Sequence, residues 1–288
     1  MKKCACLLLF VFCFLTATSQ VLTDSVLIEN HYRTFHFQKP NHTTQNFNLI
    51  FVLHGSGGNG QGMMKPAENL EKEAGKEPFL LVYPDGYKRY WNECRKSATS
   101  VANQENINEQ AFFEAMLHYF NKNYGVNGKH FYAIGLSGGG HMAYKLALTM
   151  PDKCKGISAI VANLPDQTNL DCEEAKKPVP VMIINGTNDA VNPYTGGEMK
   201  VNGSSFGRVL STENTFTYWA SLAGYKGKPK VETLPDSNSG NKQTITKYTF
   251  KKGRKPEVVL LKVIGGEHAF PEDVNGFTES WQFFKRQK

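Results

Sequence analysis

The chain of 288 residues carries 33 Lys or Arg and 26 Asp or Glu, which gives a formal net charge of +7. This length allows one large domain or two small ones. The charge pattern argues against a nucleic-acid partner, because the basic runs at 226–230 and 251–255 contain no aromatic residues and match no nucleic-acid-binding motif.

The first 19 residues have the pattern of a signal peptide. Lys2 and Lys3 precede an apolar run at 7–15, and small residues follow at 17–19. The run is short for a membrane span, which leaves a retained anchor or a buried core helix as the alternative. We therefore expect cleavage before Gln20, a secreted protein (extracellular or periplasmic), and a single domain over 20–288. No later run is long and apolar enough to span a bilayer, so no membrane partner is expected after cleavage.

Apolar runs alternate with helical periodicity along the rest of the chain. Strands are predicted at 32–37, 47–53, 79–82, 130–134, 157–162, 181–184 and 258–264, and helices at 66–74, 107–124, 139–149, 215–223 and 277–285. This alternation predicts an α/β fold with a mostly parallel central sheet and helices on both faces. In the helix at 107–124, one face is expected to hold Ala111, Ala115, Met116, His118 and Tyr119. The glycine-containing stretch 194–208 is expected to be a long loop near the functional site.

The pentapeptide Gly-Leu-Ser-Gly-Gly at 135–139 is a G-x-S-x-G nucleophile elbow. An apolar strand precedes it and a helix follows it, which is the context that this motif requires. Glycines on both sides of Ser137 leave room for a tight strand-to-helix turn, and the turn exposes the hydroxyl at the edge of the sheet. The elbow predicts a serine hydrolase with Ser137 as its nucleophile.

A serine nucleophile needs a base and an acid that orients the base, and both are predicted at strand ends. Asp189 follows the strand at 181–184 and a glycine-containing turn, and His268 follows the strand at 258–264. The chain order Ser, Asp, His is that of the α/β-hydrolases. Asp189 could instead cap a turn. His141 is the alternative base, but it lies one turn further along the helix and is expected to face neighbouring structure.

The oxyanion hole is predicted from two backbone N–H groups. One belongs to Gly138, directly after the nucleophile, and the other to Ser56 in the loop after the strand at 47–53, with Gly57 as the neighbouring alternative. The stretch 55–60 also fits the dinucleotide-binding pattern G-x-G-x-x-G. We reject that function because residues 61–65 separate the third glycine from the expected helix at 66–74, and because Asp85, the candidate ribose ligand, lies in a turn.

Three cysteines remain after the predicted leader: Cys94, Cys154 and Cys172. In an exported protein they allow one disulfide and one free thiol. Cys154 with Cys172 would close the shortest loop, but the spacing leaves the pairing open. The mature chain has no CxxC spacing of the kind that zinc ribbons use, so no metal ion is expected.

Six segments together resemble the polyhydroxybutyrate depolymerase and feruloyl esterase group of carbohydrate esterase family one, within the α/β-hydrolase superfamily. They are RTFHF at 33–37, LHGSGG at 53–58, YPDG at 83–86 followed by Trp-Asn at 91–92, GLSGGG at 135–140, NGTNDAVNPY at 185–194 and GGEHAFP at 265–271. The resemblance implies a secreted serine esterase without a metal or cofactor. It assigns the nucleophile, acid and base to Ser137, Asp189 and His268, and the oxyanion donors to Ser56 and Gly138.

The expected substrate is a small ester or an esterified plant polysaccharide of feruloyl or acetyl type. Trp91, Tyr194 and Phe270 are the candidate substrate-binding residues, although a packing role is favoured for each of them over a specific contact. The chain departs from the family at Glu267 and Phe270, where the family usually has glycine and tryptophan. It also shows no polymer-binding appendage, which favours small or soluble esters. The alternatives are a poly(3-hydroxybutyrate) depolymerase, a peptidase, and a catalytically silent hydrolase fold that binds a partner. The oligomeric state stays open.

Overall fold

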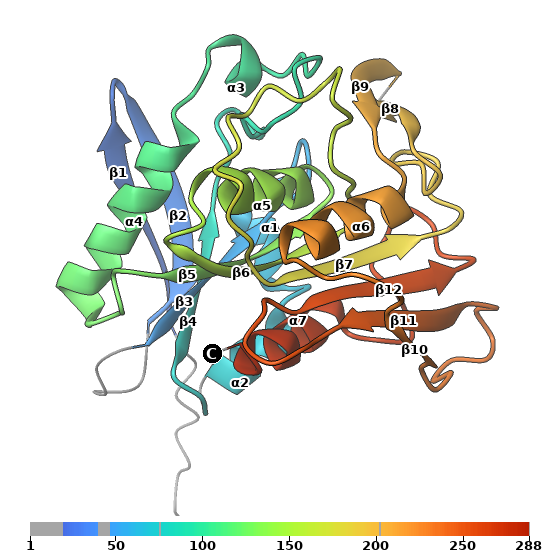
Figure 1. The fold of residues 1–288 in the computed structure, drawn as a ribbon. Helices are drawn as coiled ribbons and strands as arrows, with labels where there is room; N and C mark the ends of the chain where they lie inside the picture. Colours follow the sequence, from blue (N-terminus) through green and yellow to red (C-terminus); the bar gives the residue numbers. More distant parts are fainter. Residues whose placement is uncertain (1–19, 40–46, 75, 202, 288) are drawn as a thin grey trace, which may run out of the picture.

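A computed structural model describes residues 20–39, 47–74, 76–201 and 203–287, so the predicted leader at 1–19 lies outside the described residues. Ten strands form one sheet in the order β1-β2-β4-β3-β5-β6-β7-β12-β11-β10 (Figure 1). Their bounds are β1 Val21–Ile28, β2 His31–Gln38, β3 Asn48–Leu53, β4 Phe79–Pro84, β5 Phe131–Leu136, β6 Cys154–Ile160, β7 Val181–Gly186, β10 Lys230–Thr233, β11 Thr244–Phe250 and β12 Val258–Ile264. A separate hairpin consists of β8 Gly197–Val201 and β9 Ser204–Val209.

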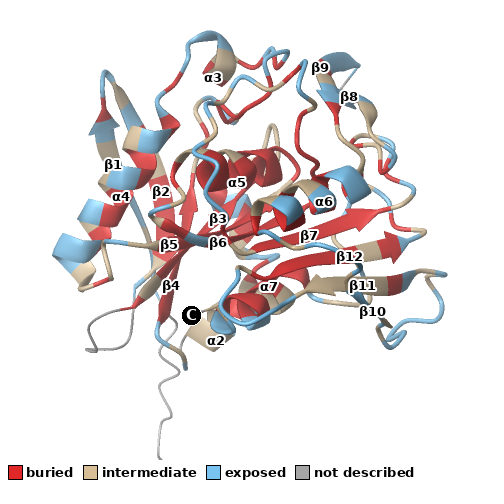
Figure 2. Cartoon of the chain, viewed as in Figure 1, coloured by how far each residue is buried: buried red, intermediate tan, exposed pale blue. Residues whose placement is uncertain are grey.

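The centre of the sheet is parallel. Strands β4, β3, β5, β6, β7 and β12 pair in parallel, and antiparallel strands extend the sheet at both ends. The central strands are apolar runs buried on both faces, as Figure 2 shows for the middle of the sheet. The predicted α/β fold with a mostly parallel sheet is therefore confirmed.

Helices cover both faces of the sheet. Their bounds are α1 Gly60–Met64, α2 Glu68–Ala74, α3 Val101–Gln104, α4 Glu109–Tyr124, α5 Gly138–Thr149, α6 Thr212–Leu222 and α7 Gly276–Lys285. Side chains of α4, α5 and α6 pack into one hydrophobic core, and side chains of α1, α2 and α7 pack into a second core on the opposite face (Figure 1). Within the described residues, no helix has the length and apolarity that crossing a membrane would require.

The face of α4 that packs on the sheet is centred on other residues than the face named from the sequence, and Met116 is common to both. The helix buries a set of large side chains, Phe112, Phe113, Met116, Leu117 and Phe120, against β1, β2 and the central strands. His118 is exposed, while Ala111, Ala115 and Tyr119 are only partly buried. Aromatic side chains bury far more area than alanine, so they decide which way the helix turns.

The helix predicted at 66–74 corresponds to α2, which begins at Glu68. Pro66 lies in the turn between α2 and the preceding α1, a helix that was not predicted. Asn59 caps α1, so this helix begins at Gly60, the third glycine of the G-x-G-x-x-G stretch. The prediction that residues 61–65 separate the third glycine from the helix is therefore wrong. The Asp85 carboxylate is nevertheless not free to bind a ribose. It already accepts the Gly60 N–H at 2.6 Å and lies 3.2 Å from His36 Nε2.

The stretch 194–208, predicted as a loop, contains the β8–β9 hairpin. Strands β1, β10 and β11 were also missed, since they lie at the sheet edges and carry mixed polar and apolar residues. The disulfide joins Cys94 to Cys172, whose Cα atoms are 5.0 Å apart. The pair with the shortest loop does not form, because Cys154 is buried at the start of β6 and its thiol is free.

Candidate active site

The elbow forms as the sequence predicts. Ser137 lies between β5 and α5 with φ 51° and ψ −115°, a strained conformation for a residue other than glycine. Its N–H donates to the Ile160 carbonyl at 2.8 Å, which fixes the turn against β6. A Cβ atom on Gly135 would collide with the backbone of Gly139, and one on Gly139 would collide with the backbone of Leu53. Both glycines of the motif are therefore required by close backbone packing.

The structure brings Ser137, Asp189 and His268 together at the carboxyl ends of β5, β7 and β12. His268 Nε2 lies 2.9 Å from Ser137 Oγ, and His268 Nδ1 lies 2.7 Å from Asp189 Oδ2. An ionised carboxylate only accepts hydrogen bonds, so His268 Nδ1–H donates to Asp189 and Nε2 is left to accept the serine hydroxyl. This arrangement can remove the hydroxyl proton as Ser137 attacks an acyl carbon.

Asp189 is held rigidly. Its Oδ1 accepts the N–H groups of Val191 at 2.8 Å and Asn192 at 2.7 Å, and the residue is 6 % exposed. A network of buried asparagine side chains supports this turn. In it, Asn185 Nδ2 donates to Asn163 Oδ1 at 2.8 Å. The Asn163 N–H in turn donates to Asn192 Oδ1 at 3.1 Å. Neither asparagine was predicted to support the site: Asn163 belongs to no motif, and Asn192 lies within the NGTNDAVNPY segment without a side-chain role that its position alone reveals.

His141 lies inside α5 and is fully buried. Burial, together with the nearby charges of Arg95 and His268, holds the pKa of His141 well below its usual value. The imidazole is therefore neutral. Within the described part of the chain, His268 and not His141 is hydrogen-bonded to Ser137.

The two predicted oxyanion donors lie side by side. A Cβ atom on Gly138 would approach Ser56 N to 2.9 Å, so the two backbones adjoin directly beside Ser137. Gly138 is the first residue of α5, where an N–H has no partner within its own helix. The alternative donor, Gly57, is occupied, because its N–H donates to the Arg89 carbonyl at 2.9 Å.

Buried side chains fix the loop that carries Ser56. His54 Nδ1 lies 2.7 Å from the Gly55 carbonyl, and His54 Nε2 accepts the Gly86 N–H at 2.9 Å. Burial lowers the pKa of His54, so its ring is neutral with the proton on Nδ1. Trp91 Nε1 donates to the His54 carbonyl at 2.9 Å. The loop is therefore preorganised by its own neighbours.

The three candidate substrate-binding residues are not brought together. Trp91 is buried and lines a narrow crevice that also contains Ser56 and Gly138. Tyr194 lines an apolar pocket between α6 and the strands β11 and β12. Phe270 lines a different pocket, beneath the segment that carries His268. Only Trp91 shares a cavity with the predicted oxyanion donors.

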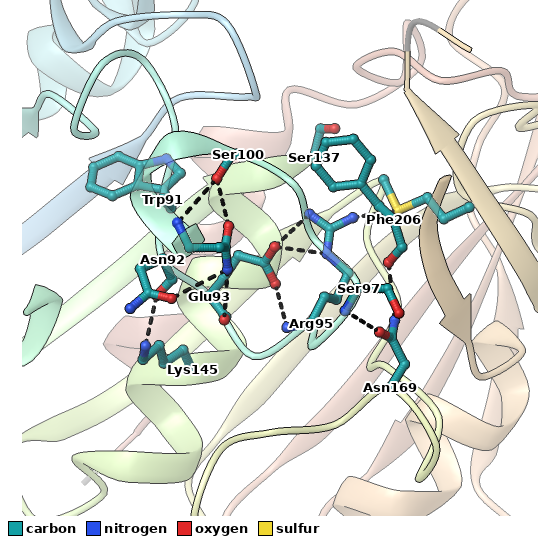
Figure 3. Close-up of polar contacts among 12 residues, drawn as sticks. Trp91, Asn92, Glu93, Arg95, Ser97, Ser100, Ser137, Lys145, Asn169 and Phe206 are labelled. Atoms are coloured by element: carbon teal, nitrogen blue, oxygen red, sulfur yellow. Dashed lines mark hydrogen bonds and ion pairs between the residues drawn. The ribbon is translucent and has the colours of Figure 1, made fainter. Parts of the chain in front are cut away.

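The same crevice contains residues that the sequence analysis missed. They are Tyr90, Glu93, Arg95 and Ser100 from the segment between β4 and α3, and Phe206 from β9. Two of them, Glu93 and Arg95, form a buried ion pair, which lies in the middle of Figure 3. The distance between Arg95 Nη2 and Glu93 Oε1 is 2.8 Å. No local pattern marks these residues, since they meet only through the tertiary fold. No group of three or more His, Cys, Asp or Glu that could hold a metal ion occurs among the described residues.

Comparisons with known proteins agree on a hydrolase family. Residues 36–205, more than half of the chain, match the family described as phospholipase/carboxylesterase. The chain is 26 % identical over 231 residues to NocK of Nocardia uniformis subsp. tsuyamanensis, a protein named as an esterase by inference. It is 28 % identical over 164 residues to feruloyl esterase C of Emericella nidulans. These matches cover 77 % and 55 % of the chain, but only 65 % and 53 % of the two relatives.

A solved structure supports the fold. The acetyl xylan esterase from Aspergillus awamori superposes with a TM-score of 0.61 at 16 % identity, over 92 % of this chain and 99 % of the other. At this identity the likeness concerns the fold alone. The matches to esterases agree with the resemblance predicted from the six sequence segments.

Proposed function

Because the chain belongs to the phospholipase/carboxylesterase family, we propose that it is a serine carboxylic ester hydrolase in which Ser137, Asp189 and His268 are the catalytic triad. The observation that carries this proposal is the position of the His268 ring, 2.9 Å from Ser137 Oγ and 2.7 Å from Asp189 Oδ2. The three side chains come from the ends of three different strands, and their mutual geometry is the one that a nucleophile, its base and the group that orients the base require.

In the proposed reaction, Ser137 Oγ attacks the ester carbonyl carbon while His268 Nε2 takes the hydroxyl proton. The N–H groups of Ser56 and Gly138 stabilise the oxyanion of the tetrahedral intermediate. His268 then gives its proton to the departing alcohol, which leaves an acyl group on Ser137. Water then attacks the acyl carbon while His268 Nε2 takes a proton from it, and His268 returns that proton to Ser137 Oγ as the carboxylic acid leaves. Asp189 holds the ring of His268 and stabilises its charged form, and no metal ion or cofactor takes part.

The proposed substrates are feruloyl or acetyl esters of plant polysaccharides, or related small esters, in line with the names of the relatives. A hydroxybutyrate polyester is the second candidate, which rests on the sequence resemblance. We further propose that residues 1–19 direct export and that 20–288 form a single domain. The Cys94–Cys172 disulfide supports export, because such bonds persist mainly in oxidising compartments.

The test compares the wild-type protein with Ser137→Ala on p-nitrophenyl acetate. We expect the variant to lose about 10⁴-fold or more in kcat, since triad residues act as a unit. Ser221→Ala, which changes an exposed serine on α6, is the matched control and should keep full activity. Equal rates for the wild type and Ser137→Ala would end the proposal.

A catalytically silent binding protein is the alternative of another class. A fluorophosphonate probe separates the two functions, because it reacts covalently only with an activated serine. The wild type should be labelled and Ser137→Ala should not. A wild-type protein that stays unlabelled and inactive on all esters would favour the binding function.

A further inference from the structure

We propose that Phe206 of β9 closes the acyl side of the site and restricts the enzyme to acetyl-sized acyl groups. This inference rests on the proposed function and names the substrate class within it. Of the feruloyl and acetyl esters that the family resemblance leaves open, it selects the acetyl esters.

The position of the crevice relative to the triad identifies the acyl side. In the proposed reaction His268 protonates the alcohol, so the alcohol lies on the His268 side of the carbonyl carbon and the acyl chain lies opposite. The crevice borders both oxyanion donors, Ser56 and Gly138. None of its described lining residues comes from the segment around His268. The crevice is therefore where an acyl chain would extend.

The crevice is too narrow to admit even a molecule of the size of water. Phe206 is one of the residues that line the crevice, and it is only 6 % exposed. An acetyl group extends least toward this crevice, because it carries only one methyl group beyond the carbonyl carbon. A butyryl chain or an aromatic acyl group would have to displace the ring.

Phe206 cannot move aside easily, because it is held from two directions. Its carbonyl accepts a hydrogen bond from Asn169 Nδ2 at 3.0 Å, and the Arg95 guanidinium lies over its ring with 5.0 Å between Cζ and the ring centroid. Asn169 also binds the loop that carries Arg95, since its Oδ1 accepts the Ser97 N–H at 2.9 Å (Figure 3). One buried asparagine thus fixes β9 to that loop.

Arg95 is itself immobilised. Its Nε donates to Glu93 Oε1 at 2.8 Å, and its Nη1 lies 2.7 Å from the sulfur of Met199 on β8. Cys94, between the two charged residues, is tied by the disulfide to Cys172. A buried ion pair is usually no gain in stability over apolar packing. Here it supplies a flat, fixed platform for the Phe206 ring, and that role explains its presence next to the site.

The test uses p-nitrophenyl acetate, butyrate and ferulate, which share one alcohol, so ratios of kcat/KM report the acyl side alone. For the wild type we expect kcat/KM to fall at least about tenfold from acetate to butyrate, and further for ferulate. In Phe206→Ala the acetate-to-butyrate ratio should shrink about tenfold. Phe206→Leu, a smaller change that keeps more of the packing, should give an intermediate ratio.

Phe216→Ala is the matched control. Phe216 is also 6 % exposed, but it lies on α6 against Phe250 and away from the crevice. Its ratio should equal that of the wild type. If the wild type hydrolyses ferulate as well as acetate, or if both Phe206 variants keep the wild-type ratio, the inference is overturned while the esterase proposal stands. If no ester is hydrolysed and the fluorophosphonate does not react, the proposed function fails and this inference fails with it.

Discussion

At the scale of single residues, the two oxygens of Asp189 have different tasks. Oδ1 holds the turn through two backbone N–H groups, and Oδ2 faces His268. In Asp189→Asn the carbonyl oxygen can keep the turn, but the amide then presents N–H to His268 Nδ1. That ring nitrogen must become an acceptor, so Nε2 carries the proton and can no longer accept the one from Ser137.

We therefore expect Asp189→Asn to lose about 10³–10⁴-fold in kcat on p-nitrophenyl acetate, with little change in unfolding midpoint. Asp152→Asn is a control at an exposed aspartate that pairs with Lys177. Steady-state kinetics and a urea titration of all three proteins provide the check. A variant within tenfold of the wild type would show that Asp189 does not orient the base.

The residues that sequence reasoning could find are those with a positional signature. Ser137 is marked by its pentapeptide, and Asp189 and His268 by their places after apolar strands. Arg95 and Phe206 have no such signature, because they become neighbours only when the β8–β9 hairpin packs on the 92–97 segment. A charged residue in a loop looks solvated from the sequence, and its burial depends on a partner far along the chain.

At the scale of elements, the packing of α2 on β4 has a measurable consequence for pH dependence. Glu71 of α2 is partly buried and accepts the Tyr83 hydroxyl at 2.6 Å. Burial raises the pKa of Glu71 to about 7, from an ordinary value near 4.5. The folded state therefore binds this proton more tightly than the unfolded chain does. Its stabilising contribution is fully present below pH 4.5 and is lost as the pH rises through about 7.

We expect the ionisation of Glu71 to lower the free energy of unfolding by about 2–4 kcal/mol between pH 4.5 and 8. Glu71→Gln keeps an acceptor for Tyr83 but cannot titrate, so it should remove that part of the slope. Glu68→Gln, at an exposed glutamate one turn away, should keep the slope. Denaturant titrations at a series of pH values measure it. The same slope in the Glu71 variant as in the wild type would contradict the assignment.

The first turn of α7 gives a second prediction at this scale. Asn275 Oδ1 accepts the N–H groups of Phe277 at 3.1 Å and Thr278 at 3.0 Å, which caps the helix. Asn275→Ala should lower the free energy of unfolding by about 1 kcal/mol, whereas Asn275→Ser, which can still cap, should lower it by much less. Chemical denaturation distinguishes the two variants. If Asn275→Ala were as stable as Asn275→Ser and the wild type, the cap would contribute nothing to stability.

Elements were predictable where burial on both faces leaves a continuous apolar run, as in β3, β7 and β12. They were not predictable at the edges. Strand β1 alternates with exposed polar residues, and β8 and β9 carry glycines that read as loop. The face of α4 that packs on the sheet was not predicted for a different reason, since the sequence shows a helical period but not which strands the helix will contact.

At the scale of the whole molecule, the order of the sheet explains why the site forms. Strands β5, β6, β7 and β12 are successive neighbours, so the segments after them meet at one edge (Figure 1). Parallel pairing places every carboxyl end on that edge. The alternation of strands and helices made this arrangement predictable. The packing of the β8–β9 hairpin was not predictable. It depends on Asn169, on Met199 and on a disulfide whose pairing the cysteine spacing left open.

That disulfide spans 78 residues and so constrains a large part of the unfolded chain. Closing a loop of this length stabilises a fold by about 4–5 kcal/mol in the chain-entropy account. The double variant Cys94→Ala with Cys172→Ala should therefore lose that amount of its free energy of unfolding. Its unfolding midpoint should move to a lower denaturant concentration. Dithiothreitol should destabilise the wild type to a similar extent and leave the double variant unchanged, which controls for effects of the reductant on buried Cys154.

Because the bond also holds the Arg95 platform, the double variant should hydrolyse p-nitrophenyl butyrate better relative to acetate than the wild type does. Unchanged stability together with unchanged acyl selectivity would show that the bond fixes neither the fold nor the crevice.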